Sequence, residues 1–273
     1  MAGPAHRRHY LQMPPPLHIR TYHELTEADR SGLGEQVGAQ HRRVAERLAP
    51  VHRVVAVMSG KGGVGKSFVT ALLARALARA GRRVGALDAD LNGPTLARLL
   101  DARGPLAVTA GGVEPVAGTD GVRCVSMAHL LEDGKPLAFK GPGSDAFIWR
   151  GALEAAALRE LLGDVTWVAL DMLLVDLPPG VARLHELLDL LPAPPDVLAV
   201  TIATVESADA VRRALNAARE RGARLLGVIE NMAGPQFPGD AGDTLSREFA
   251  IPLLARIPFN PGDAMWQTLG ERL

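Results

Sequence analysis

The chain has 273 residues, 47% of them hydrophobic, and its 30 basic and 30 acidic side chains give a formal net charge of +0. This length and composition predict one large α/β domain with a substantial core. The balanced charge gives no general electrostatic reason to bind nucleic acid or an anionic membrane, so neither is expected as a partner. The single cysteine, Cys124, excludes an internal disulfide framework. Together with the lack of an uninterrupted spanning segment, it predicts a cytoplasmic protein.

The beginning of the chain is predicted to form a tail and an accessory helix. Residues 1–24 contain three consecutive prolines and a cluster of histidine and arginine without apolar periodicity, which predicts a disordered tail. A metal site formed by these histidines is the alternative. Residues 25–50 predict an amphipathic helix that begins after Thr26 and packs on the main domain, residues 51–273. Its apolar face would carry Leu33, Val37, Val44 and Leu48.

The stretch at residues 53–67 has the sequence Arg-Val-Val-Ala-Val-Met-Ser-Gly-Lys-Gly-Gly-Val-Gly-Lys-Ser. An apolar run leads into a glycine-rich turn and a helical pattern follows, which is the context that the phosphate-binding loop G-x-x-x-x-G-K-[ST] requires. In such a loop backbone N–H groups surround an anion, Lys66 reaches the β- and γ-phosphates, and Ser67 ligates Mg²⁺. ATP and Mg²⁺ are therefore the predicted cofactors; a glycine turn without a ligand is the alternative. The predicted nucleotide-binding residues of this stretch are Gly60, Lys61, Gly62, Gly63, Val64, Gly65, Lys66, Ser67 and Phe68.

Two further predicted strands end in carboxylates. Residues 84–87 form an apolar run that leads into Asp88-Ala-Asp90, and a second apolar run ends at Asp176, before Leu-Pro-Pro-Gly. In a parallel α/β sheet the carboxyl ends of the strands border the ligand crevice. We therefore expect Asp90 to orient or deprotonate the attacking water, Asp88 to support the Mg²⁺ side, and Asp176 to hold Mg²⁺ directly or through water. An acidic loop that caps the next helix together with Asn92 is the alternative for Asp88 and Asp90.

The rest of the chain alternates predicted strands and helices. Short β pieces between residues 106 and 126 predict a small sheet extension, with Cys124 half-buried in a strand. A doubly wound, mainly parallel sheet with helices on both faces is favoured by strands at 197–201, 225–229 and 253–257 that alternate with helices at 207–221 and 243–249. Asn231 then follows a strand at the carboxyl edge, where its amide can pair with an adenine. An asparagine placed in a turn for backbone reasons is the alternative.

These motifs together resemble the Mrp-type ATPases, which are ApbC-like iron–sulfur cluster carriers within the wider MinD/ParA group. The resemblance covers residues 53–261 and rests on the lysine after the first P-loop glycine, Asp90-Leu-Asn-Gly-Pro-Thr95, Trp149-Arg-Gly151, Leu174-Val-Asp-Leu-Pro-Pro-Gly180 and Glu230-Asn-Met232. It implies an ATP-hydrolysing homodimer in which Lys61 crosses to the partner's nucleotide, beside the catalytic Lys66 and Asp90. It also implies Asn231 as an adenine contact and iron–sulfur proteins as clients. A surface lysine without a role is the alternative for Lys61.

The sequence departs from the family pattern at three places. The family carries a Cys-x-x-Cys pair shortly after the Glu-Asn-Met motif, and two subunits use these pairs to hold one [4Fe–4S] cluster, whereas residues 233–240 contain no cysteine here. Phe68 replaces the threonine that supports the α-phosphate, and Val181-Ala-Arg-Leu184 follows the Pro-Pro-Gly turn in place of Gly-Thr-Gly-Asp. ATP binding is expected to survive these changes more easily than cluster carriage. An iron–sulfur carrier ATPase is the function that the resemblance implies; a cluster-free dimeric ATPase switch and a MinD/ParA-like positioning ATPase are the alternatives.

Overall fold

The structure is a computed structural model that describes residues 33–91, 93–130, 156–262 and 269–270. The chain divides into two units, Met1–Ala39 and Gln40–Leu273. Of the first unit, the structure describes the beginning of helix α1 (Leu33–Leu48). The predicted tail, the predicted helix start at Thr26 and the Trp149-Arg-Gly motif lie outside the described residues.

Helix α1 buries only part of its predicted apolar face. Val44 and Leu48 are buried in the core of the second unit, whereas the Val37 side chain, in the first unit, is 44% exposed. From Val44 onward the helix has apolar side chains to pack on, and Arg47 donates a hydrogen bond to the carbonyl oxygen of Gly163. The last turns of the helix belong to the second unit and pack within its core.

An eight-stranded sheet forms the centre of the second unit. Its strand order is β10-β9-β8-β1-β7-β2-β6-β5, and every neighbouring pair is parallel except β5 with β6. This order confirms the predicted doubly wound sheet, in which crossover helices return the chain to the same edge. The main strands are β1 (Val54–Ser59), β2 (Val84–Asp88), β7 (Met172–Asp176), β8 (Asp196–Thr201), β9 (Leu225–Ala233) and β10 (Leu253–Pro258).

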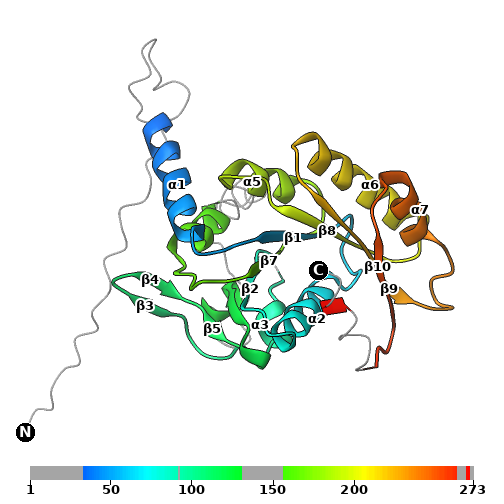
Figure 1. Cartoon of the computed structure of the whole chain (residues 1–273), viewed down its shortest axis with the longest axis horizontal. Coiled ribbons are helices and arrows are strands. Elements are labelled where there is room, and N and C mark those ends of the chain that lie inside the picture. Colours follow the sequence, from blue (N-terminus) through cyan, green and yellow to red (C-terminus); the bar gives the residue numbers. More distant parts are fainter. Residues whose placement is uncertain (1–32, 92, 131–155, 263–268, 271–273) are drawn as a thin grey trace, which may run out of the picture. The chain divides into compact units, whose positions relative to one another are not determined.

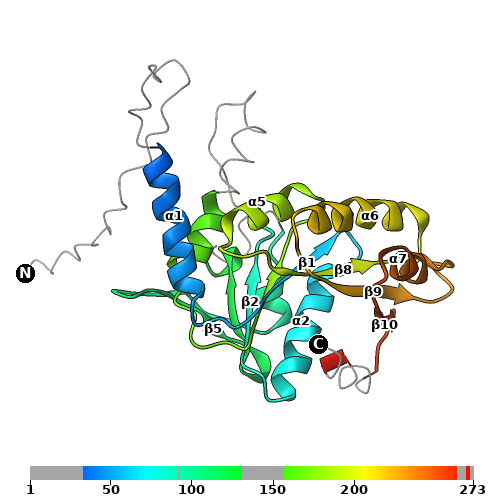
Figure 2. The same ribbon diagram turned by 45° about the horizontal axis from the view of Figure 1, so that its top comes forward.

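Helices cover both faces of this sheet (Figure 1, Figure 2). On one face lie α2 (Lys66–Arg79) and α3 (Leu96–Leu99), and on the other lie α5 (Ala182–Leu190), α6 (Val205–Glu220) and α7 (Ala241–Phe249). A further helical stretch covers residues 156–164. Side chains of β1 alternate between the two cores: Val55 and Val57 pack with α2, whereas Ala56 and Met58 pack with α5 and α6. Because β1 is buried on both faces, it gives the loop that follows it a rigid base.

Part of the segment between α3 and β7 extends the main sheet, as predicted, and part forms a second, smaller sheet. β3 (Ala107–Thr109) and β4 (Gly112–Glu114) form a small antiparallel pair of their own, while β5 (Val116–Ala117) and β6 (Arg123–Ser126) join the main sheet. Two short 3-10 turns, Thr119–Gly121 and Met127–Leu130, flank β6. Cys124 is fully buried rather than half-buried, because β6 pairs with β2 and its side chain enters the core beside α2.

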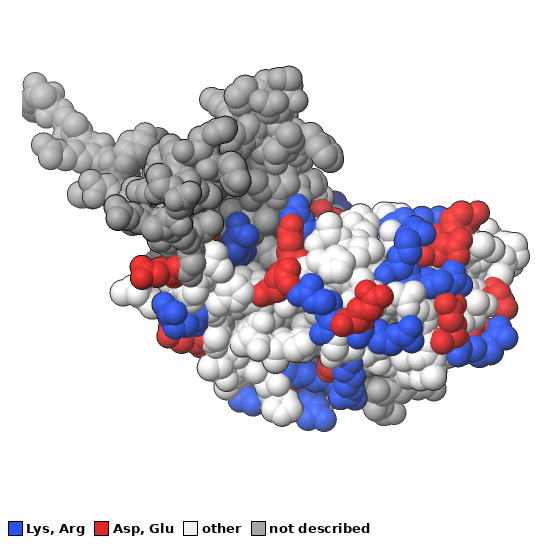
Figure 3. Space-filling view, turned by 90° about the horizontal axis from the view of Figure 1, so that it is seen from above, with Lys and Arg blue, Asp and Glu red and all other residues white. Residues whose placement is uncertain are grey.

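The face formed by α5, α6 and α7 carries interspersed basic and acidic side chains (Figure 3). Arg212 pairs with both Asp209 and Glu248, and Arg221 pairs with Asp189. Both signs of charge are therefore interspersed on this face, and several of the charged side chains form ion pairs. Within the part of the chain that the structure describes, none of the helices is both long and apolar enough to cross a bilayer.

Candidate functional site

The glycine-rich loop connects the end of β1 to the start of α2 at the carboxyl edge of the sheet. Gly63 and Gly65 have φ angles of 81° and 76°, in the left-handed region that glycine adopts without strain. A Cβ atom on Gly65 would lie 2.3 Å from Nδ2 of Asn231. A Cβ atom on Gly60 would lie 2.3 Å from the Cβ of Ala210 on α6. The predicted phosphate loop is therefore held on two sides, and Gly60 is required by helix packing as well as by the loop's shape.

Four side chains converge at the start of α2. Nζ of Lys66 lies 2.6 Å from Oδ1 of Asp176, and the hydroxyl of Ser67 donates to Oδ2 of Asp176 at 2.5 Å. Thr70, one helical turn later, donates to the same Oδ1 at 2.8 Å. Asp176 is fully buried and Lys66 is 6% exposed, so the ion pair is shielded from water. The structure thus brings together the predicted Lys66, Ser67 and Asp176 and adds Thr70 to them.

A row of polar side chains crosses the sheet at the same level. Asp176 at the end of β7 is in register with Asp88 at the end of β2, and Asp88 is in register with Ser126 at the end of β6. Oδ2 of Asp88 accepts hydrogen bonds from the Ser126 hydroxyl and from the backbone N–H of Leu96, the first residue of α3. Burial, and then the nearby charge of Asp176, raise the pKa of Asp88 to about 7. Two buried carboxylates side by side form a site that favours a cation.

The loop after β2 uses its carboxylates for local hydrogen bonds. The backbone N–H of Asp90 donates to Oδ1 of Asp88, and Oδ1 of Asp90 accepts from the N–H of Gly93. Asp88 therefore binds the start of α3 as the helix-capping alternative expects, while Asn92 lies outside the described residues. The catalytic role of Asp90 and the metal role of Asp88 stay predictions.

The Pro-Pro-Gly turn after β7 packs against the phosphate loop. The N–H of Gly180 donates to the carbonyl oxygen of Ser59, and a Cβ atom on Gly62 would lie 3.8 Å from Cγ of Pro179. Lys61 is half-buried in this part of the loop, and its carbonyl oxygen accepts from the Ser59 hydroxyl. Its ammonium group forms no ion pair with any described residue. The turn therefore packs directly against the loop, and the reach of Lys61 to a partner subunit's nucleotide stays a prediction.

Asn231 lies within β9 and not after it, because the strand extends to Ala233 instead of ending at Ile229. Its Nδ2 donates to the carbonyl oxygen of Val64 in the phosphate loop at 2.9 Å, and the side chain is buried. The following residue, Met232, has a φ of 54°, and its Cε lies 3.4 Å from the position of a Cβ on Gly65. Asn231 therefore braces the loop, and its contact with adenine stays a prediction. Phe68, also predicted to bind the nucleotide, is partly buried against the core on the α2 face.

The sequence did not predict two side chains of the site, Thr70 and Ser126. Only Thr70 could have been found from a local pattern. Thr70 follows Lys66 by four positions, which places both on the same face of a helix, so it could have been found from the spacing. Ser126 ends a short strand whose place beside β2 depends on pairing with residues far away in the sequence. That pairing has no local pattern.

The arrangement fits a magnesium-bound nucleoside triphosphate. Left-handed glycines and a helix N-terminus turn N–H groups toward an anion, and Lys66 adds a positive charge. The Ser67 hydroxyl and the Asp176 carboxylate supply oxygen ligands of the kind that Mg²⁺ prefers, with Asp88 behind them. These residues can hold a triphosphate and its metal at one edge of the sheet.

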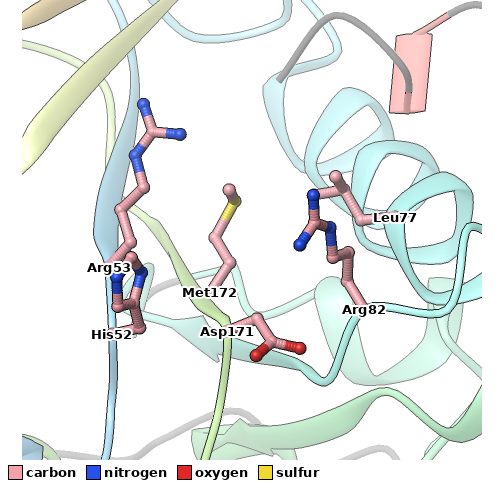
Figure 4. Close-up of a pocket in the computed structure, with 6 residues that line it drawn as sticks. All are labelled: His52, Arg53, Leu77, Arg82, Asp171 and Met172. Atoms are coloured by element: carbon pink, nitrogen blue, oxygen red, sulfur yellow. The ribbon is translucent and has the colours of Figure 1, made fainter.

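A cavity of about 350 Å³ lies at the opposite, amino edge of the strands (Figure 4). His52, Arg53, Arg82 and Asp171 line it together with the apolar side chains of Leu77 and Met172. Two of its charged groups already form ion pairs, Arg53 with Asp196 and Asp171 with Arg83, which lies outside the lining. The cavity is therefore separate from the phosphate loop and takes no part in the site described above.

The sheet, the left-handed glycine loop and the buried Lys66–Asp176 pair together define a P-loop NTPase. A family model, ParA, described as the NUBPL iron-transfer P-loop NTPase, matches residues 50–271. The chain belongs to this family.

Two relatives support this assignment along most of the chain. An "Iron-sulfur cluster carrier protein" of Saccharolobus solfataricus is 35% identical over 256 residues, which cover 89% of this chain and 83% of that protein. A "Cytosolic Fe-S cluster assembly factor CFD1" of Chaetomium globosum is 39% identical over 241 residues, which cover 78% of this chain and 76% of that protein.

Solved structures agree with the fold. A nucleotide-binding protein of Archaeoglobus fulgidus in complex with ADP superposes with a TM-score of 0.65 at 32% identity, covering 85% of this chain and 91% of that one. The cell division ATPase MinD of Pyrococcus furiosus superposes with a TM-score of 0.56 at 23% identity, covering 81% of this chain and 98% of that one. The second likeness concerns the fold alone.

Proposed function

We propose that the protein is a Mg²⁺-dependent ATPase that acts as a homodimer in the assembly of iron–sulfur clusters. The observation that carries this proposal is the convergence of Lys66, Ser67 and Thr70 on the buried carboxylate of Asp176 at the mouth of the glycine loop. Such a cluster of groups has a direct use in phosphoryl transfer, where nearly all of the catalysis is positioning and charge stabilisation.

The reaction is the hydrolysis of ATP to ADP and phosphate. Loop N–H groups and Lys66 would bind the β- and γ-phosphates, and Ser67 and Asp176, supported by Asp88, would hold Mg²⁺. Mg²⁺, when bound, neutralises charge that develops on the phosphate oxygens. Asp90 orients a water and accepts its proton as the water oxygen bonds to the γ-phosphorus and the bond to the bridging oxygen breaks.

Lys61 is assigned to the partner subunit's nucleotide. Its backbone belongs to the loop, but its ammonium group has no ion-pair partner among the described residues, which supports a role outside its own subunit. A cation that reaches the transferring phosphate from a partner can contribute about 10³ to 10⁵ in rate, by analogy with arginine fingers. Hydrolysis would then require a dimer closed across two nucleotides.

The place of the protein in iron–sulfur assembly rests on its relatives, which are named as a cluster carrier and as cytosolic assembly factors. Clients would be iron–sulfur proteins, and the cytoplasm is the proposed location. The chain's own residues do not fit a bridging cluster, because the one cysteine is buried inside β6. This favours, as a second candidate, an ATPase switch that serves assembly without carrying the cluster itself.

The test compares the wild type with Lys66→Ala and Lys61→Ala. If Mg-ATP binds only the folded state, ligand at about 100 times its Kd should raise the free energy of unfolding by about 2.7 kcal/mol. Lys66→Ala should lose most of this stabilisation, whereas Lys61→Ala should keep it and lose hydrolysis. Lys66→Ala also leaves Asp176 buried without its cation, which by itself lowers the free energy of unfolding. Each variant is therefore measured with and without ligand, and only the difference is compared.

The controls separate binding from catalysis. Lys61→Arg keeps the positive charge at the position and should retain part of the hydrolysis. Equal stabilisation by Mg-ATP in Lys66→Ala would mean that the nucleotide binds elsewhere. Activity per subunit that stays constant on dilution into a demonstrably monomeric range would contradict the role of Lys61 across the dimer.

A further inference from the structure

Thr70 occupies a position in α2 that faces the end of β7. Its side chain is fully buried, and its Oγ1 lies 2.8 Å from Oδ1 of Asp176 and 3.0 Å from the carbonyl oxygen of Lys66. Ser67 holds the other carboxylate oxygen, Oδ2. Each oxygen of Asp176 thus has a hydroxyl donor from the first turns of the same helix.

The carboxylate is the better acceptor for the Thr70 proton. A threonine in a helix often bonds only to the carbonyl oxygen four residues earlier, which would be a purely local role. A hydroxyl has one proton to donate. The carboxylate oxygen is nearer and ionised, and hydrogen bonds to ionised acceptors are about twice as strong as neutral ones. The Thr70 proton therefore goes to Asp176.

Nucleotide binding changes the set of donors around Asp176. Oδ1 now accepts from Lys66 as well as from Thr70, but Lys66 is the residue that reaches for the β- and γ-phosphates. When Lys66 turns to the phosphates, Oδ1 loses its charged donor. The carboxylate is fully buried, and the Thr70 hydroxyl is then the donor that remains on Oδ1 among the described residues. Thr70, which touches neither phosphate nor metal in the proposed site, keeps its hydrogen bond throughout.

We propose that Thr70 is a positioning residue for Asp176: it fixes Oδ1, so that Oδ2 beside Ser67 stays aimed at the metal after Lys66 moves to the phosphates. The inference rests on the proposed Mg-ATP function. It predicts that the Thr70 hydroxyl matters for metal-dependent binding and turnover, and little for nucleotide binding without metal.

The experiment uses two pairs of proteins, and the members of each pair differ in the hydroxyl group at position 70. The wild type and Thr70→Val form the first pair. Thr70→Val removes the hydroxyl while keeping the branched shape, and Thr70→Ser and Thr70→Ala form a second pair that differs only by the hydroxyl. Thr244→Val, a threonine in α7 away from the site, is the matched control for the same change in a helix. For each protein a fluorescent ATP analogue is titrated in EDTA and across a Mg²⁺ series, and kcat is measured across the same series.

Loss of a hydrogen bond to an ionised group corresponds to about a tenfold to hundredfold effect. Thr70→Val and Thr70→Ala should therefore raise the half-saturating Mg²⁺ concentration and lower kcat by at least about tenfold. Affinity in EDTA should stay within about twofold of the wild type, and Thr70→Ser should recover most of both losses, because it restores the hydroxyl. Thr244→Val should behave like the wild type.

Equal Mg²⁺ dependence in the Ser and Ala variants would overturn the role of Thr70, even if Thr70→Val does not fold. Equal impairment of Thr70→Ser and Thr70→Val would also overturn it, because shape and not the hydroxyl would then be at work. A wild type without Mg²⁺-dependent nucleotide binding would instead overturn the proposed function and this inference with it.

Discussion

Asp88 is a buried carboxylate whose protonation should affect the stability of the fold. Burial and the neighbouring charge of Asp176 raise its pKa to about 7 from an ordinary value near 3.8. As pH rises, Asp88 therefore loses its proton at a lower pH in the unfolded chain than in the folded one. Between the two pKa values the folded state binds more protons than the unfolded state. The free energy of unfolding must then fall as pH rises through this window and level off above the folded pKa.

Asp88→Asn should remove this pH dependence, because the amide is neutral at every pH and its oxygen can still accept from the N–H of Leu96. In the absence of metal and nucleotide, the variant should gain on the wild type by up to about 4 kcal/mol between pH 4 and pH 8. Denaturant unfolding at a series of pH values measures this difference. Asp189→Asn, an exposed aspartate on α5, is the matched control. Wild-type and Asp88→Asn curves that run parallel over this range would contradict the prediction.

Individual site residues could be predicted where their spacing is local. Lys66 and Ser67 are fixed by the pattern of the glycine loop, and Asp176 by an apolar run before it. What each carboxylate touches could not be predicted, because it depends on strand register across the sheet. Asp88 meets Ser126 only because β2 and β6 pair, and nothing near either residue in the sequence indicates that pairing.

At the scale of elements, the side chain of Asn231 connects β9 to the phosphate loop by a hydrogen bond. Asn231 donates from a buried position in the strand to the carbonyl oxygen of Val64. Asn231→Ala would leave that carbonyl without its partner, which costs about 1 to 3 kcal/mol in buried surroundings. We expect a lower free energy of unfolding in denaturant and a nucleotide affinity that falls by about tenfold, because the loop is no longer held in its binding shape.

A triphosphate ligand that lacks the adenine base can distinguish the two roles of Asn231, its hydrogen bond to the loop and its predicted contact with adenine. If Asn231 braces the loop, Asn231→Ala should weaken Mg-tripolyphosphate and Mg-ATP alike, as measured by calorimetry. A loss confined to ATP would support the adenine contact and contradict the brace. Asn216→Ala, which removes a half-buried amide that accepts a hydrogen bond from Arg219 on α6, should leave both affinities unchanged.

Elements themselves were predictable where apolar runs and helical periodicity are strong. The strands before the loop and before Asp176, and the helices α6 and α7, lie within a few residues of their predicted places. The extension of β9 through Asn231 was not predictable, because it follows from pairing with β10 as far as Ala233. The burial of Cys124 likewise results from the insertion of β6 between β2 and β5.

At the scale of the whole molecule, the question is what a dimer of this chain can carry. Iron–sulfur clusters are held by thiolates, usually four, and with one cysteine per chain a dimer supplies two. Cys124 is fully buried in β6, and burial, with the charge of Asp88 adding to it, raises the pKa of its thiol. The thiolate that a cluster requires is therefore disfavoured, and the two copies are enclosed in separate cores.

We therefore predict that anaerobic reconstitution with iron and sulfide yields well under one four-iron cluster per dimer. Cys124→Ala should bind the same small amount of iron and sulfide as the wild type, because the buried thiol takes no part in binding. Iron and sulfide assays, with absorption spectra of protein kept free of air, measure both quantities. Mg-ATP binding should persist in the same preparations, since Asp176 and the glycine loop do not depend on the thiol; this serves as the control for intact protein. A stable four-iron cluster per dimer that disappears in Cys124→Ala would overturn the prediction, because it would require β6 to leave the sheet and expose its cysteine.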